Sequence, residues 1–309
     1  MPERPEFQQP PLAVTLPRTD YFELDSVHAG DRFAVWVTRP VDYERSEETR
    51  FPAIYVTDGN VGAAMLSPYA EHTAFDLISG FQQYLQVTIG YPPDKAADWL
   101  TLRNRDLVPA GEPAPPSMIA AVAADAETAG WTQAEHDEYI RSIHEGRAAQ
   151  FLAFLEEELR PVIDEHYRTD PAGTGLFGYS YGGLFTLFAL MHESRVFRRY
   201  GAGSPGVLVA DSQIFRLERG VAERGQGFGG VQLHLTVNEL EITGRSHVYR
   251  DLGIQFARLV DRLWLSGHAG LEFTARILPA DSHMTGFTQA FLSYLRACYG
   301  APVPPGGGL

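Results

Sequence analysis

The chain has 309 residues, of which 44% are hydrophobic and 12% aromatic, enough to bury the core of one large α/β domain. Its formal net charge of −14 argues against a nucleic-acid partner, because phosphate binding depends on clustered Lys and Arg. No apolar run approaches the roughly 20 residues that span a bilayer, so we expect no membrane anchor. The single Cys298 cannot form an internal disulfide and the N-terminus lacks a signal-peptide pattern, which predicts a cytoplasmic protein.

Both ends of the chain are rich in Pro and Gly. We therefore expect residues 1–20 and 301–309 to be mobile segments that flank one domain at 21–300. Alternation of apolar and polar residues at 21–27 and 31–40 predicts an opening antiparallel pair of strands. Further apolar runs predict six strands buried on both faces, at 51–56, 84–91, 173–180, 198–206, 231–239 and 271–283.

Stretches with apolar residues every three or four positions predict helices at 145–166, 181–192 and 246–267. Strands that alternate with helices indicate a mostly parallel sheet covered on both faces. The interval 109–145 breaks this alternation: a breaker-rich loop precedes two short helical stretches, the second opened by a capping box of Thr132 and Glu135. An insertion of this length predicts a lid over a site.

The stretch "GLFGYSYGGL" places Ser180 in a Gly-x-Ser-x-Gly motif between a predicted buried strand and a predicted helix. This context is that of a nucleophilic serine, because the sharp turn that projects the hydroxyl needs small flanking residues. A serine needs a base, and His283 fits, since it follows the last predicted strand on a short loop. The other reading of the motif is a Gly-rich turn with an incidental serine.

The triad acid is expected after the preceding strand, where a carboxylate can accept the Nδ1 proton of the histidine. "NELE" offers Glu239 and Glu241 there. We prefer Glu239, as the first carboxylate past the strand, and Glu241 remains the alternative, as does a site in which neither acts.

Attack by the serine creates an oxyanion that needs two hydrogen-bond donors. The backbone N–H of Tyr181 is the expected first donor, because it follows the nucleophile directly. The second is expected after the strand "AIYVTDGN", from the amide of Asn60 or Val61. Asp-Gly-Asn is also an ordinary turn sequence.

From about residue 20 to 299 the chain resembles the putative esterase family of α/β-hydrolases, especially its bacterial siderophore esterases. The resemblance is carried, in order, by "FPAIYVTDGN", "TIGYP", "RNRDLVP", "FLAFLEEELRPVIDEHYRTD", "GYSYGGLF", "FRRYGAGSPG", "VNELE" and "LPADSHMTG". It implies an α/β-hydrolase fold and a serine esterase with Ser180 as nucleophile and His283 as base. It also implies Asn60 as the second oxyanion position.

The chain departs from that family at three places, one of which is Asn238, where relatives commonly have Gly. Tyr179 stands where relatives often have His before the serine, which makes it a candidate substrate contact, and "SPGVLV" lacks the aromatic residues that often follow Ser-Pro. In "RNRDLVP", Arg103 and Arg105 are further candidates, since a guanidinium can clamp an anionic substrate group. Their other interpretation is a structural ion pair with Asp106 or Asp58.

These residues together predict hydrolysis of a carboxylic ester or lactone through an acyl-enzyme, without a metal or organic cofactor. The expected partner is a small-molecule ester, of siderophore type if the resemblance extends to the substrate. Two alternatives stay open: an acyltransferase that uses the same residues, and a silent binding module on the same fold. The oligomeric state cannot be predicted from this sequence.

Overall fold

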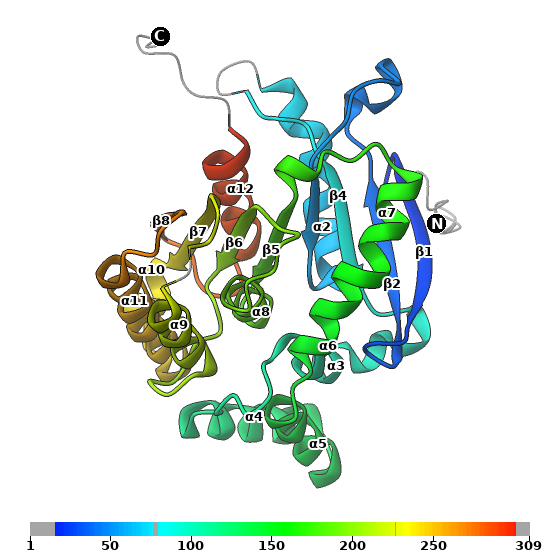
Figure 1. Cartoon of the computed structure of the whole chain (residues 1–309). Coiled ribbons are helices and arrows are strands. Elements are labelled where there is room, and N and C mark those ends of the chain that lie inside the picture. Colours follow the sequence, from blue (N-terminus) through cyan, green and yellow to red (C-terminus); the bar gives the residue numbers. More distant parts are fainter. Residues whose placement is uncertain (1–15, 77–79, 226, 301–309) are drawn as a thin grey trace, which may run out of the picture.

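A computed structural model describes residues 16–76, 80–225 and 227–300, and Figure 1 shows their arrangement. Within these residues, eight strands form one mixed sheet in the order β1-β2-β4-β3-β5-β6-β7-β8. The pairings β1–β2 and β2–β4 are antiparallel, and all the others are parallel. The strands are β1 (Thr19–Ser26), β2 (Asp31–Thr38), β3 (Ala53–Val56), β4 (Leu85–Gly90), β5 (Gly175–Tyr179), β6 (Arg199–Gly203), β7 (Val231–Asn238) and β8 (Leu271–Leu278).

Helices follow most of the strands and cover the sheet on both faces (Figure 1). The predicted long helix at 145–166 is continuous in direction but contains a π-helical turn at Phe154–Leu159 between α6 and α7. The helices are α2 (Gly59–His72), α3 (Trp99–Leu107), α4 (Pro116–Ala129), α5 (Gln133–His144), α6 (Ala148–Ala153), α7 (Arg160–His166), α8 (Tyr181–Met191), α9 (Gln213–Arg224), α10 (Glu239–Thr243), α11 (His247–Ser266) and α12 (Gly286–Tyr299).

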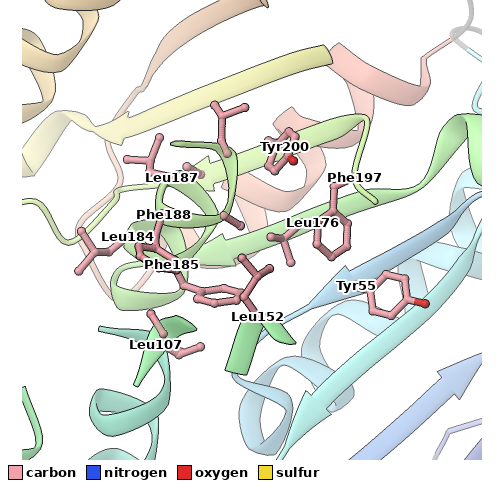
Figure 2. Close-up of a cluster of buried hydrophobic side chains, with 14 of the residues drawn as sticks. Tyr55, Leu107, Leu152, Leu176, Leu184, Phe185, Leu187, Phe188, Phe197 and Tyr200 are labelled. Carbon is pink, nitrogen blue, oxygen red and sulfur yellow. The ribbon is translucent and has the colours of Figure 1, made fainter. Parts of the chain in front are cut away.

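The alternation of side chains along the central strands divides the core in two. Ile54 and Val56 of β3 pack with α2 and α12, while Tyr55 between them belongs to a larger cluster on the opposite face. Figure 2 shows part of that larger cluster, in which α8 contributes Leu184 and Phe185. The sheet is therefore held rigidly from both sides, and its strand ends can position loops precisely.

The strand β8 differs from its prediction. It was expected to be buried on both faces, but it closes the sheet and only its last residue, Leu278, is buried. The apolar residues of "LEFTARIL" alternate with Glu272, Thr274 and Arg276, which is the pattern of a strand with one face toward water.

The interval 109–145 forms α4 and α5, which project from the rest of the fold in Figure 1. Thr132 and Glu135 make the predicted capping box at the start of α5. β1 begins at Thr19, slightly before the strand start predicted at residue 21. Segments 1–15 and 301–309, expected to be mobile, lie outside the described residues. Among the described residues, no helix combines the length and apolar content needed to cross a membrane.

Candidate active site

Ser180 lies at the turn from β5 to α8 with a backbone φ of 57° and ψ of −119°. This conformation is rare for a residue with a side chain, and hydrogen bonds hold it: Ser180 N donates to Gly203 O (2.9 Å), and Gly206 N donates to Ser180 O (2.8 Å). A Cβ at Gly178 would collide with the backbone of Gly182. The motif glycines are thus required by the close approach of the strand to the helix that presents Ser180.

His283 lies on the loop between β8 and α12, where Glu241 contacts it. The distance from His283 Nδ1 to Glu241 Oε1 is 2.5 Å. The other carboxylate oxygen, Oε2, accepts from Asn238 N (2.7 Å) and from Ser204 Oγ (2.8 Å). The Glu241 carboxylate is therefore fixed by three donors, and its bond to Nδ1 leaves Nε2 as the histidine nitrogen available for a proton from a substrate or nucleophile.

The preference for Glu239 as the partner of His283 was wrong. The Glu239 carboxylate instead accepts from Ala280 N (2.7 Å). The reason is local: Asn238 is the N-cap of α10, and a capping box turns the third helical residue, Glu241, back toward the Asn238 backbone. Glu239 is the first residue of that helix and lies on a different side of it.

Burial and hydrogen bonding act in opposite directions on Glu241. Removal from water favours its neutral form, but the bonds from His283, Asn238 N and Ser204 outweigh this and hold the pKa of the carboxyl below its ordinary value. Glu241 is consequently ionised near neutral pH and can stabilise positive charge on the imidazole.

Two tyrosines support His283. The Tyr179 hydroxyl donates to His283 O (2.6 Å) and accepts from Asn238 Nδ2 (2.6 Å). The ring of Tyr249 stacks on the imidazole, with centroids 4.5 Å apart and planes 19° from parallel. Tyr179, expected as a substrate contact, thus uses its hydroxyl to hold the His283 loop, although its ring also lines a cavity.

The candidate oxyanion donors stand at two neighbouring helix N-termini. Tyr181 is the first residue of α8 and Asn60 the second of α2, and these helices follow the adjacent strands β5 and β3. The Asn60 side chain exchanges two 2.8 Å hydrogen bonds with the Tyr91 backbone, which fixes the loop. Val61 N donates to Asp58 O (3.1 Å), whereas the amides of Tyr181 and Asn60 donate to no residue in the described part of the chain. Asn60 rather than Val61 is therefore the donor that the geometry favours.

The two predicted arginines have different surroundings. Arg103 makes a two-point ion pair with Asp58, with Nε–Oδ1 at 2.5 Å and Nη2–Oδ2 at 3.0 Å, and it borders the cavities at Ser180. Arg105 instead bonds both oxygens of Asp106 and also Asp31, at 2.7–2.8 Å. The ion pairs of Arg105 are structural and connect α3 to β2. Of the two arginines, only Arg103 lies at the site.

Two cavities meet at Ser180 and His283. One, of about 350 Å³, lies under α4 and α5; its lining includes Met118, Val122, Tyr139, Leu208, Val248 and Tyr249. The other, of about 360 Å³, is mostly apolar and its lining includes Val61, Met65, Trp99, Leu100, Met284 and Phe287. Arg103 borders both cavities. An ester carbonyl at Ser180 would therefore have space for a group on either side.

Sequence reasoning missed the supporting role of three residues. Ser204 bonds Glu241, Tyr249 stacks on His283, and Asn238 bonds the Tyr179 hydroxyl and Ser204 Oγ. The pattern Asn-x-x-Glu at 238–241 was a usable signal, because a capping box predicts which glutamate turns back. Among the described residues, no group of three or more His, Cys, Asp and Glu side chains is arranged to hold a metal ion.

Comparison with known proteins finds esterases among the relatives of this chain. Residues 111–226 match the family described as "Putative esterase". The ferri-bacillibactin esterase BesA of Bacillus subtilis is 27% identical over 196 residues, 63% of this chain and 61% of the relative. The siderophore triacetylfusarinine C esterase of Aspergillus fumigatus is 29% identical over 206 residues, 64% of this chain and 59% of the relative. The matches thus span about three-fifths of these curated relatives.

Solved structures confirm the predicted fold. The BES protein from Bacillus cereus superposes with a TM-score of 0.72 at 22% identity, covering 95% of this chain and 98% of the other. An IroE-like serine hydrolase from Shewanella oneidensis gives 0.68 at 23% identity, covering 90% and 79%. The fold is that of the α/β-hydrolases, and the chain is similar, at modest identity, to the putative esterase family over residues 111–226 and to siderophore esterases over about two-thirds of its length.

Proposed function

We propose that this chain is a serine esterase that cleaves a carboxylic ester or lactone through an acyl-enzyme, with Ser180 as nucleophile, His283 as base and Glu241 as acid. The observation that carries the proposal is the 2.5 Å contact between Glu241 Oε1 and His283 Nδ1. His283 and Ser180 line the same two cavities, so the histidine lies where it can serve the serine. In this arrangement the histidine can act as general base for the serine, and the buried carboxylate stabilises the positive charge that the imidazole then carries.

In the proposed reaction, Ser180 Oγ attacks the carbonyl carbon while its proton passes to His283 Nε2. The Tyr181 and Asn60 amides hold the oxyanion, and the imidazolium is stabilised by Glu241. Collapse of the tetrahedral intermediate breaks the ester bond, and the imidazolium gives its proton to the departing alkoxide. Water then attacks the acyl-enzyme with His283 as base, which releases the acid and restores Ser180. This cycle uses no metal or organic cofactor.

The two cavities support a substrate with bulk on both sides of the ester. The cavity at Met65 and Phe287 suits an apolar group, and the cavity under α4 and α5 offers the rings of Tyr139 and Tyr249. We propose that α4 and α5 act as a cover over the bound substrate, because Met118 and Tyr139 line that cavity. The names of the relatives support a siderophore-type ester or lactone as substrate.

The proposal is tested by ester hydrolysis with the native chain and with Ser180→Ala. We expect the variant to lose several orders of magnitude in kcat/KM, with an unchanged unfolding temperature, because only the attacking oxygen is removed. Activated aryl esters test the chemistry, and a siderophore trilactone tests the substrate class. Retained turnover by Ser180→Ala would overturn the mechanism, while hydrolysis of aryl esters without any of the trilactone would overturn only the substrate class.

A further inference from the structure

The outer edge of the sheet at β8 is long and exposed. In the part of the chain that the structure describes, β8 pairs with a strand on one side only, β7, and it has eight residues. The four residues 274–277 are all exposed, with Ile277 at 59%. The strand contains no Pro; the nearest one, Pro279, comes directly after its last residue. An edge of this length, with unpaired backbone groups, is a template for pairing with another strand.

Apolar side chains accompany this edge on one face of the sheet. Trp264 of α11 is 70% exposed, and its ring packs on Phe273 of β8 with centroids 4.9 Å apart and planes at 61°. Leu265, the next residue of α11, is 79% exposed. Large exposed apolar side chains gathered beside an open strand are typical of an interaction surface.

The charges of β8 are complementary to a second copy of the same strand. In an antiparallel pair centred on Thr274, Glu272 of each copy stands opposite Arg276 of the other, because both residues lie two positions from the centre. Opposite charges in directly facing positions stabilise a pair of strands. Neither side chain makes an ion pair with any residue in the described part of its own chain.

The same register also matches the apolar residues. Leu271 stands opposite Ile277, and Phe273 stands opposite Ala275. A two-fold axis perpendicular to the sheet, midway between the two Thr274 residues, keeps the same face of both sheets on one side. The α11 helices of the two copies would then lie on the same face, where the exposed Trp264 and Leu265 find apolar neighbours.

The opposite edge of the sheet lacks this complementarity. The charged residues of β1 are Asp20, Glu23 and Asp25, all acidic, so two copies of β1 would bring carboxylates together. We therefore propose that two copies of this chain associate through β8, antiparallel about Thr274, so that their sheets join into one continuous sheet.

The test is the oligomeric state of charge-reversed variants, measured by analytical ultracentrifugation over a concentration series. Glu272→Arg places arginines opposite each other, and Arg276→Glu does the same with glutamates. We expect each single variant to weaken the dimer at least about ten-fold, and the double variant Glu272→Arg/Arg276→Glu to restore it. The matched control is Glu48→Arg, an exposed reversal in the loop before β3, four strands away in the sheet.

The rescue by the double variant separates pairing from misfolding, because a variant that fails to fold is not repaired by a second reversal. Far-UV circular dichroism and the unfolding temperature of each variant check this directly. A native chain that stays monomeric at all concentrations would overturn the proposal. So would a dimer that tolerates both single reversals, or a double variant that remains as weak as the single ones.

Discussion

Glu241 Oε1 lies 2.5 Å from His283 Nδ1, while the carboxylate two residues earlier, on Glu239, bonds Ala280 N instead. The two glutamates are therefore a matched pair for mutation. We expect Glu241→Gln to lower kcat by about 10²–10⁴-fold, because an amide cannot stabilise the imidazolium. Glu239→Gln should change kcat only a few-fold, since a glutamine oxygen can still accept from Ala280 N. Steady-state kinetics on one aryl ester checks both, and a larger loss in Glu239→Gln would reverse the assignment.

Asn60 is predicted to act through its backbone, with its side chain holding the loop. Asn60→Ala removes both hydrogen bonds to Tyr91 but keeps the Asn60 N–H. We expect a fall of about 10–10³-fold in kcat with a smaller effect on KM, because the donor shifts from the position where the oxyanion forms. The comparison variant is Asn104→Ala, a buried asparagine on α3 outside both cavities. Equal losses in the two variants would reduce the Asn60 effect to general destabilisation.

The motif glycine Gly182 is predicted to be intolerant of a methyl group. A Cβ there would collide with Thr57 Oγ1 and lie 3.0 Å from Asp58 Oδ2. We expect Gly182→Ala to destabilise the fold by about 2–4 kcal/mol and to abolish esterase activity, because α8 must move away from β3. The matched control is Gly220→Ala in α9, where the nearest atom is Arg224 Nη1, at 3.3 Å on a flexible side chain. That change should stabilise the chain by about 0.5–1 kcal/mol, measured by urea unfolding.

Glu112 is predicted to make stability fall with rising pH. Burial raises its pKa to about 7, although Gln213 N donates to Oε2 (2.8 Å). The folded chain thus keeps a proton that the unfolded chain releases near pH 4.3 (about the ordinary glutamate pKa). This contribution is complete below that pH and is lost as the pH rises to about 7.

At pH 8 the free energy of unfolding of Glu112→Gln, measured with urea, should therefore exceed that of the native chain by about 1–3 kcal/mol. Its advantage should shrink at pH 5, because the native carboxyl is then protonated. Glu223→Gln on α9, an exposed position, serves as the control and should show no such trend. An advantage for Glu112→Gln that is equal at both pH values would contradict the raised pKa.

Much of the fold was predictable because the relevant patterns are local. The strand that ends at Tyr179 and the helix that begins at Tyr181 follow from an apolar run and a helical period, and the glycines around Ser180 identify the turn between them. The capping box at Thr132 was likewise predicted and confirmed. These features depend on residues within a few positions of one another.

The errors arise where distant parts of the chain decide. Whether a strand lies at the centre or the edge depends on sheet order, so the apolar residues of β8 were mistaken for a buried run. The choice between Glu239 and Glu241 depends on which side of a short helix faces a loop 42 residues later. Arg103 and Arg105 differ through Asp58 and Asp31, which distant segments bring to α3.

The central claim is that His283 and Glu241 activate Ser180. Intact-mass spectrometry after incubation with a fluorophosphonate tests it most directly, because the reagent phosphonylates an activated serine and needs no knowledge of the substrate. We predict one adduct on the native chain, none on Ser180→Ala or His283→Ala, and much slower labelling of Glu241→Gln than of Glu239→Gln. A native chain that stays unlabelled, or an adduct that persists in Ser180→Ala at the same rate, would contradict the account.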